Sequence, residues 1–577
     1  MKRWYKYIKP YLPFFILGPL CMIIEVIGEV LMPKYLSMII NGANNKTLSV
    51  PGCLGVMGLM ILTAVLMMLG GIGGAYFGGK ASVNFAADLR SDVFTKVQKF
   101  SFANIDKFSS GSLVTRLTND VTQMQNVVNM ALRMLLRAPG MLIGGLIMAI
   151  ALKPSLSVVF AVTLPLLLIS VISIISVGFP RFSRMQTKID ALNSTVQENI
   201  TNMRVVKSFV REDHEKKKFG KANRDLKDSG ISAMRVMIFM SPVMTFFMNI
   251  TIIAVIWFGG RIVLSGDMDI GDLSAFITYV SQILSSLMMV TVMFMMSSRA
   301  IASGKRICEV LDEKLDLTDE DAKQPEKTVT SGRIEFRNVS FRYYKSSTDP
   351  VLDNISFTVE PGMTVGIIGS TGCGKTTLVS MIPRLYDADS GEVLVDGVNV
   401  KDYSLRNLRE GVGMVLQKNV LFSGTIEENL RWGDEHATDA ELTAAAKSAQ
   451  ADKFVREFAN GYRTELGQGG VNVSGGQKQR LCIARALLKK PKILILDDST
   501  SAVDTATEAQ IRKAFVNELS GSTKIVIAQR ISSVCDADMI IVMSDGKITG
   551  IGRHDDLLAN NEEYREIYES QTGKTAV

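Results

Sequence analysis

Gly369-Ser-Thr-Gly-Cys-Gly-Lys-Thr-Thr377 is the stretch that decides the fold of the C-terminal half of the chain. It matches the pattern GxxxxGK[ST] and lies between the apolar run TVGII and the run TTLVSMI. Glycines at this spacing let backbone N–H groups turn toward phosphate oxygens, and a helix N-terminus adds a favourable dipole. The stretch therefore predicts a strand, a phosphate-binding loop and a helix, in that order.

The loop and a later strand together predict a site for ATP and Mg²⁺. Lys375 should neutralise the β- and γ-phosphates, and the Thr376 hydroxyl should ligate Mg²⁺. Downstream, the apolar run KILILDDST predicts a strand that ends at Asp497, where an acid can hold Mg²⁺ through water. These elements predict a P-loop NTPase. The predicted ATP-binding residues of the loop are Gly369, Ser370, Thr371, Gly372, Cys373, Gly374, Lys375, Thr376 and Thr377.

The N-terminal half has the composition of a membrane domain. Of the 577 residues, 47% are hydrophobic and only 21% are charged, which excludes disorder, collagen and small disulfide scaffolds. Long uncharged runs crowd the first 300 residues, and each of six runs can cross a hydrocarbon core of ~30 Å. The predicted spans lie near 11–40, 54–79, 129–152, 155–180, 238–265 and 271–298.

The charges of the connections predict the orientation of the spans. Segment 80–126 holds six Lys and Arg residues and segment 181–235 holds thirteen, whereas the other connections carry almost none. Basic connections stay on the cytoplasmic side. Both termini and the C-terminal domain should therefore be cytoplasmic, and spans two to five should continue into the cytoplasm as long helices. The net charge of +7 lies beside the spans, so no nucleic-acid partner is expected.

Small and charged residues inside the spans carry further expectations. Gly70, Gly74 and Gly78 repeat every four residues, which is typical of closely packed membrane helices. Glu25 and Glu29 lie one turn apart in the first span, and Arg133 and Arg137 do so in the third. Charges in lipid are costly, so these four either pair with one another or line a cavity. The acidic pair mildly favours cationic amphiphiles as cargo.

The expected architecture is an all-α transmembrane domain of six long helices followed by an α/β P-loop ATPase domain. The transmembrane domain, with its two long cytoplasmic connections, should cover 1–310. The polar, acidic stretch 311–332 lacks apolar periodicity and should be a linker, and the ATPase domain should cover 333–577. The six cysteines are scattered and form no CxxC pair, so neither a zinc site nor a disulfide framework is indicated.

A further motif points to a family. Val473-Ser-Gly-Gly-Gln477 resembles the signature motif of ATP-binding cassette (ABC) proteins. In that family Ser474, Gly475, Gly476 and Gln477 would grip the γ-phosphate of ATP bound to the opposite subunit. Tyr343 resembles the aromatic residue that stacks on adenine, and Gln417 resembles the Q-loop glutamine that contacts Mg²⁺. Ser501–Asp504 resembles the D-loop, and residues 100–120 resemble the first cytoplasmic coupling region of six-span exporters.

Two positions depart from the family pattern. After the Walker B aspartate the family normally has glutamate, which orients the attacking water, but here Asp498 stands, shorter by ~1.5 Å of reach. The family's switch histidine is replaced by Gln529, which cannot take a cationic form. The shorter reach of Asp498 would misplace the attacking water, and a displacement of this size costs about 10²-fold in rate. The resemblance therefore implies a site that binds ATP and hydrolyses it poorly.

The resulting hypothesis is the degenerate-site subunit of a heterodimeric ABC exporter in a bacterial plasma membrane. Its partner would be a second half-transporter, and its surroundings and cargo would be membrane lipid and an amphipathic small molecule such as a drug or a lipid. The resemblance leaves four alternatives open: a homodimeric exporter with slow ATPase, an importer of metal chelates on the same fold, a lipid or peptide exporter, and a membrane-anchored ATP sensor that transports nothing.

Overall fold

The computed structural model describes residues 2–343, 349–498 and 505–572. Contacts between residues divide the chain into two compact units. The first unit combines Met1–Val97 with Gly111–Asp312, and the second combines Gln98–Ser110 with Glu313–Val577.

The first unit is built of long helices. Six helical stretches among the described residues are long and apolar enough to cross a membrane: Arg3–Asn44, Val50–Gln98, Ser110–Leu152, Pro154–Thr201, Glu212–Leu264 and Ile270–Val290. Their elements are α1 (Lys2–Ile8), α2 (Leu12–Asn44), α3 (Val50–Gln98), α5 (Ser110–Thr115), a π-helical turn (Arg116–Asp120), α6 (Val121–Met134), α7 (Arg137–Leu152), α8 (Pro154–Thr201), α9 (Met203–Ser208), α10 (Glu212–Met237), α11 (Met240–Leu264) and α12 (Ile270–Asp312).

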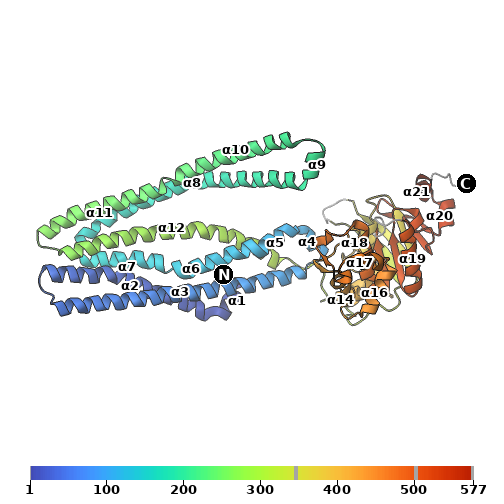
Figure 1. Cartoon of the computed structure of the whole chain (residues 1–577), viewed down its shortest axis with the longest axis horizontal. Helices are drawn as coiled ribbons and strands as arrows, with labels where there is room; N and C mark the ends of the chain where they lie inside the picture. Colours follow the sequence, from blue (N-terminus) through green and yellow to red (C-terminus); the bar gives the residue numbers. More distant parts are fainter. Residues whose placement is uncertain (1, 344–348, 499–504, 573–577) are drawn as a thin grey trace. The chain divides into compact units, whose positions relative to one another are not determined.

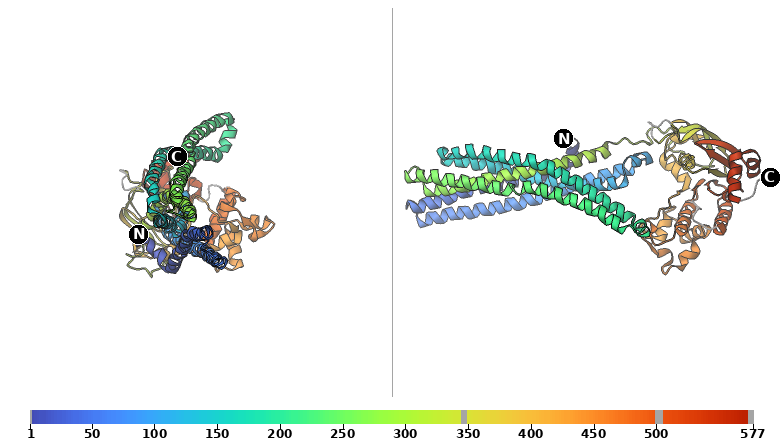
Figure 2. Two further views of the ribbon diagram at one scale, coloured as in Figure 1. Left: turned by 90° about the vertical axis from the view of Figure 1, so that its left-hand side faces the viewer. Right: turned by 90° about the horizontal axis from the view of Figure 1, so that it is seen from above.

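Several of these helices are much longer than a bilayer requires. Helix α3 has 49 residues and α8 has 48, whereas about 20 residues span a hydrocarbon core. Figure 1 and Figure 2 show α8 and α10 as a long hairpin closed by α9. The lengths of these helices confirm that the predicted spans continue as helices longer than a membrane requires.

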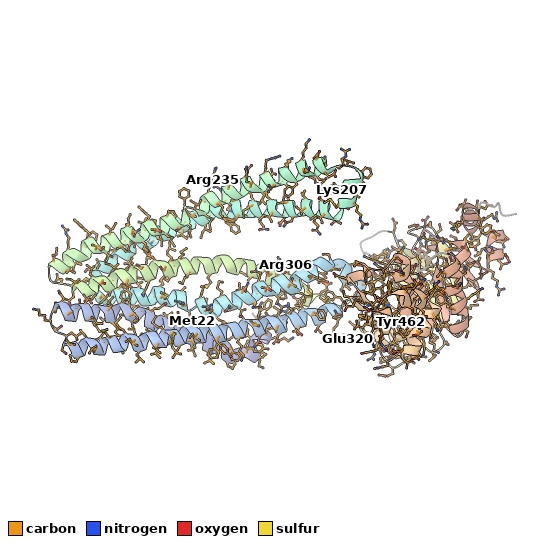
Figure 3. All side chains as sticks on the ribbon, in the orientation of Figure 1. Met22, Lys207, Arg235, Arg306, Glu320 and Tyr462 are labelled. Atoms are coloured by element: carbon orange, nitrogen blue, oxygen red, sulfur yellow. The ribbon has the colours of Figure 1, made fainter. Side chains whose placement is uncertain are left out.

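Helix α12 lies against α2 and α7, and its buried side chains form the centre of the apolar core of this unit. Tyr279 is fully buried, and its hydroxyl donates to the Val30 carbonyl oxygen at 2.8 Å. Nearer the end of α12, Arg306 (labelled in Figure 3) donates through Nε to Asp120 Oδ2 at 2.8 Å, and Ser303 donates to Oδ1 at 2.8 Å. These polar contacts fix the position of α12 against the π-helical turn.

Helices α2 and α3 approach each other along the glycine repeat. A Cβ added at Gly70 would lie 2.8 Å from the Cys21 carbonyl oxygen, and one at Gly74 would lie 2.5 Å from Met22 Cε. A Cβ at Gly78 would meet only ordinary contacts, from 3.6 Å outward. Gly70 and Gly74 therefore leave little room for a Cβ, whereas Gly78 leaves room for one. The helices are also close at Gly78, since a Cβ added at Gly18 on α2 would lie 3.4 Å from the Gly78 nitrogen.

The second unit contains two larger sheets and a short two-stranded one. A six-stranded sheet has the order β12-β11-β3-β10-β9-β6 and is parallel except for β12, and a four-stranded antiparallel sheet has the order β2-β1-β4-β5. The strands are β1 (Ile334–Phe341), β2 (Leu352–Val359), β3 (Thr364–Gly369), β4 (Ser390–Val395), β5 (Val398–Asn399), β6 (Val412–Val415), β7 (Gly424–Thr425), β8 (Glu465–Leu466), β9 (Ile493–Asp497), β10 (Thr523–Ile527), β11 (Met539–Ser544) and β12 (Lys547–Gly552).

Helices cover the parallel sheet and form a separate helical subdomain. Strand β9 is buried along its whole length, as expected for a strand covered on both faces. The helices of this unit are α4 (Phe102–Lys107), α13 (Lys375–Ser380), α14 (Leu405–Gly411), α15 (Ile426–Arg431), α16 (Asp439–Ser448), α17 (Asp452–Glu457), α18 (Gly475–Leu488), α19 (Thr505–Glu518), α20 (His554–Asn560) and α21 (Glu562–Thr572). The predicted fold class, six long apolar helices followed by an α/β P-loop domain, is confirmed.

A short piece of the N-terminal half belongs to the second unit. Helix α4 is capped by Ser101, and Asn104 donates to the Lys314 carbonyl oxygen at 3.0 Å. Lys107 pairs with Glu313 at 2.7 Å. Helix α12 ends at Asp312 and β1 begins at Ile334, so the chain between them has no strand or α-helix.

Replacing Gly70 with alanine should lower the apparent Tm of the detergent-solubilised protein. The new Cβ would meet backbone, which cannot move aside without shifting α2. Overpacking of this kind costs about 1–3 kcal/mol. Gly79→Ala is the matched control on the same helix, because a Cβ there meets nothing within 4 Å. An unchanged or higher Tm for Gly70→Ala would contradict the close packing of α2 and α3.

Candidate active site

The phosphate-binding loop follows β3 and requires glycine at two positions for steric reasons. Gly374 has a φ of 97°, and a Cβ there would lie 2.8 Å from the Val351 carbonyl oxygen. Gly369 has a φ of 153°, and its Cβ would lie 2.1 Å from the Met543 carbonyl oxygen. The loop backbone therefore packs directly on neighbouring backbone. Ser370, Thr371 and Gly372 between these two glycines are exposed, while Cys373 is buried.

Lys375 begins α13 and folds back over the loop. Its Nζ donates to the carbonyl oxygens of Gly369 at 2.9 Å and Ser370 at 2.7 Å. The ammonium group therefore stands at the mouth of the loop, where a phosphate oxygen can replace a carbonyl as its acceptor. This position fits the predicted role of Lys375 toward the β- and γ-phosphates of ATP.

Thr376 and Asp497 meet beside the loop and offer oxygen ligands to a divalent cation. The Thr376 hydroxyl donates to Asp497 Oδ1 at 3.0 Å. Asp497 is 1% exposed, and its Oδ2 has no hydrogen-bond partner within the described residues. Burial raises the pKa of Asp497, and the nearby charge of Asp498 adds to this. A buried carboxylate oxygen without a partner next to a hydroxyl fits Mg²⁺, which prefers hard oxygen ligands.

Asp498 is held by two glutamine side chains. It follows β9 with a φ of 48°, a conformation that aspartate adopts more readily than most residues. Gln529 Nε2 donates to Asp498 Oδ2 at 2.7 Å, and the side chain of Gln417 also hydrogen-bonds this carboxylate. Burial raises the pKa of Asp498, and the hydrogen bonds from the two glutamine side chains partly offset this increase. The sequence singled out Asp498 and Gln529 separately and gave no sign that they touch.

Gln417 was predicted to contact both ATP and Mg²⁺. In the structure it is exposed and its amide is engaged with Asp498. Gln479, which the sequence analysis did not select, is 1% exposed, and its amide donates to the Asp498 carbonyl oxygen at 3.5 Å. Its place two residues after the Ser-Gly-Gly-Gln motif was the only sequence signal that could have found it.

The aromatic position is built by three rings. The Tyr343 hydroxyl shares a hydrogen bond of 2.8 Å with the Thr377 hydroxyl at the end of the loop. Phe341 and Tyr386 contact Tyr343 edge-on, with ring centroids 5.1 Å and 5.2 Å away. Tyr343 remains 43% exposed, so a ring face is available for a base to stack on. Tyr386 was missed because its sequence position, after α13, carries no motif.

Tyr386 also reaches the short helix contributed by the N-terminal half. Its hydroxyl donates to Asp106 Oδ2 at 3.3 Å, and its ring lies 6.0 Å from that of Phe102. A continuous set of contacts therefore runs from the Thr377 hydroxyl through Tyr343 and Tyr386 to α4. A change at the aromatic position can be felt at α4 through direct contacts.

The Ser-Gly-Gly-Gln motif forms the start of α18. Ser474 caps the helix by accepting from the Gln477 N–H at 3.3 Å, and Gln477 Oε1 accepts from the Ser474 N–H at 2.9 Å. Gly475 and Gly476 occupy the first turn, whose N–H groups have no partner inside a helix. This end of α18 can therefore bind an anion. Within the described residues, no hydrogen bond or ion pair joins it to the phosphate-binding loop of the same chain. Asp504 lies outside the described residues.

Comparison with known proteins agrees with this geometry. Residues 15–287 match the ABC transporter transmembrane region, and residues 352–501 match the family described as ABC transporter. The ABC transporter ATP-binding protein YfiB of Bacillus subtilis is 39% identical, over 100% of this chain and 99% of that protein. A fatty acid ABC transporter ATP-binding/permease protein of Mycobacterium bovis is 35% identical, over 83% of this chain and 75% of that protein.

A solved structure shares the fold along nearly the whole chain. The structure of a bacterial Atm1-family ABC exporter with ATP bound matches with a TM-score of 0.81, covering 98% of this chain and 99% of that chain at 24% identity. The sequence match to YfiB is what identifies the family, and this structure shows that the fold is of the exporter type. The chain is therefore a multi-pass membrane protein of the ABC transporter family, with its transmembrane region and its ATP-binding domain on one polypeptide.

Proposed function

We propose that this chain is the degenerate-site half of a heterodimeric ABC exporter. The hydrogen bond from Gln529 to Asp498 is the observation that carries the proposal. A general base must reach the attacking water and accept its proton, whereas Asp498 is one methylene shorter than glutamate and its Oδ2 is turned toward the Gln529 amide at 2.7 Å. An amide, unlike histidine, cannot become cationic to stabilise charge that develops on the phosphate.

The same chain keeps the residues needed to bind ATP. Bound ATP supplies binding energy for closure and, at a competent site, the γ-phosphoryl group for hydrolysis. Lys375 and the loop would hold the phosphates, Tyr343 would hold the base, and Thr376 with Asp497 would hold Mg²⁺. Slow hydrolysis at this site would keep the two ATP-binding domains together between turnovers at the other site.

The start of α18 supports the second half of the proposal. Ser474 and Gln477 form a capping box at this helix N-terminus, with the two glycines in its first turn, so the signature motif is nearly intact. We infer that Ser474–Gln477, together with the D-loop residue Asp504, complete the partner's competent ATP site, where hydrolysis resets the transporter. The ATP-binding domain and both termini would face the cytoplasm, because the strongly basic connections lie on that side.

The proposed cargo is amphipathic and lipid-like. The first unit is a set of apolar helices with a few buried charges, and a relative that is 35% identical is named a fatty acid transporter. The cargo would move by alternating access, with the two ATP-binding domains closing on ATP and shifting the equilibrium between two states of the membrane domain.

The chain purified alone in lipid nanodiscs should bind ATP and turn it over slowly. Asp498→Glu combined with Gln529→His should restore an aligned base and a switch residue, and such a base contributes about 10²–10⁴-fold in rate. Phosphate release measures turnover, and ATP photocrosslinking measures binding. Adding Lys375→Ala to the double variant is the control, since it should abolish the gain. Equal turnover by the native chain and the double variant would refute the degenerate site.

The two composite sites should respond differently to mutation when the chain is co-purified with a half-transporter that carries glutamate and histidine at the matching positions. Ser474→Arg fills the anion site at α18 and should reduce the ATPase rate of the complex at least about tenfold. Asp498→Asn should change it less than about twofold, since this site contributes little. Ser520→Arg, at an exposed position of the same domain, controls for the added arginine. The reverse pattern would exchange the roles of the two sites.

A further inference from the structure

The two arginines of the third membrane span differ in their contacts. Arg137 at the start of α7 donates to Glu25 at 2.9 Å and to Glu29 at 2.6 Å, both on α2. The alternative that the intramembrane charges pair with one another is confirmed for these three residues. Arg133, one turn earlier on α6, is exposed and makes no ion pair or hydrogen bond with the residues that the structure describes.

A pocket of about 250 Å³ opens beside Arg133. Both arginines line it, and neither glutamate does. The Glu25 carboxylate instead faces α3, where a Cβ on Gly71 would lie 3.4 Å from its Oε2. The lining of the pocket therefore includes two guanidinium groups and neither carboxylate, and both carboxylates pair with Arg137. The lining residues are Met22, Asn126, Asn129, Met130, Arg133, Met134, Arg137 and Met289.

Two further features of the pocket point to a ligand. Asn129 Oδ1 and Arg137 Nε are buried and have no hydrogen-bond partner among the described residues, and the same holds for Glu25 Oε2 and Glu29 Oε2, whose residues do not line the pocket. A buried polar atom without a partner is costly, so the two atoms of the lining residues favour a bound group that satisfies them. Apart from Asn126, the remaining lining residues are methionines, which adapt to apolar surfaces of varied shape. Met22, labelled in Figure 3, is only 1% exposed.

We infer that this pocket binds the acidic head group of an anionic amphiphile. Arg133 supplies the charge, Arg137 Nε donates a further hydrogen bond, Asn129 accepts one from a hydroxyl or N–H on the ligand, and the methionines contact the first carbons of its chain. A volume of 250 Å³ accommodates a head group and leaves the chain to extend outside. The inference rests on the proposed transport function and names its substrate class.

This inference reverses the expectation of cationic cargo. That expectation required carboxylates that line the cavity, but neither glutamate lines it and both pair with Arg137. An unpaired arginine in a membrane-spanning segment is costly and is a functional-site candidate by default. Arg133 is therefore the charge left for a ligand to neutralise.

Binding of single-chain probes to the full-length chain in phosphatidylcholine nanodiscs, without ATP, tests the inference. By microscale thermophoresis, dodecyl phosphate should bind at least about tenfold more tightly than dodecyltrimethylammonium or inorganic phosphate. Arg133→Gln should remove most of this advantage, and Arg133→Lys should keep part of it. Arg261→Gln is the matched control, because Arg261 also lies in a span and lines a different cavity.

Glu29→Gln should change the affinity for dodecyl phosphate in the direction opposite to Arg133→Gln. It frees Arg137 from one carboxylate, so dodecyl phosphate should bind more tightly, which a purely structural role of the arginines would not produce. Competition by phosphatidylglycerol in the disc would identify a membrane lipid as the source of the head group, and its absence a free amphiphile. Both results retain the anionic ligand.

The inference is overturned if dodecyltrimethylammonium binds as tightly as dodecyl phosphate, or if Arg133→Gln leaves dodecyl phosphate binding unchanged. Equally tight binding of inorganic phosphate would overturn the amphiphilic character of the ligand. None of these results bears on the unequal ATP sites, which the ATPase comparison of Ser474→Arg and Asp498→Asn tests separately.

Discussion

The parallel pairing of β3, β10 and β9 is the constraint on which the ATP site depends. Ile527 of β10 is opposite Ile367 on one side and Asp497 on the other. Because the strands are parallel, their carboxyl ends meet at one edge of the sheet. The phosphate-binding loop, the pair Asp497–Asp498 and Gln529 therefore emerge together. The buried apolar residues of these strands hold them in the sheet.

This arrangement makes the two departures from the family pattern a single structural feature. Asp498 leaves β9 and Gln529 leaves the neighbouring β10, so their side chains meet at 2.7 Å. The Asp498 carboxylate accepts a hydrogen bond from the Gln529 amide, so the buried carboxylate has a protein donor in place of water. Restoring only one of the two family residues would change the partner of the other. The two residues therefore form one structural unit at the end of β9 and β10.

The membrane unit has to accommodate charged side chains in its apolar helices. Charges are costly in lipid, and Arg137 lowers that cost by bridging two carboxylates on α2. Arg133 lies one turn earlier, near the end of α6 and just before the break at Leu135–Leu136, and it lines a pocket instead. Two arginines one turn apart thus have different roles, one in packing and one facing a ligand-sized space.

The six apolar helices and the P-loop domain could be read from the sequence alone, which also predicted the residues of the ATP site. These follow from local properties: hydropathy over about 20 residues and motifs of a few neighbouring residues with a fixed backbone shape. Only the tertiary structure decided that Gln529 touches Asp498, that Tyr386 supports Tyr343, that α4 belongs with the second unit, and that Arg137 rather than Arg133 neutralises the glutamates. Each of these is a contact between residues distant in the chain. Such contacts depend on strand order and helix rotation, which no short stretch of sequence encodes.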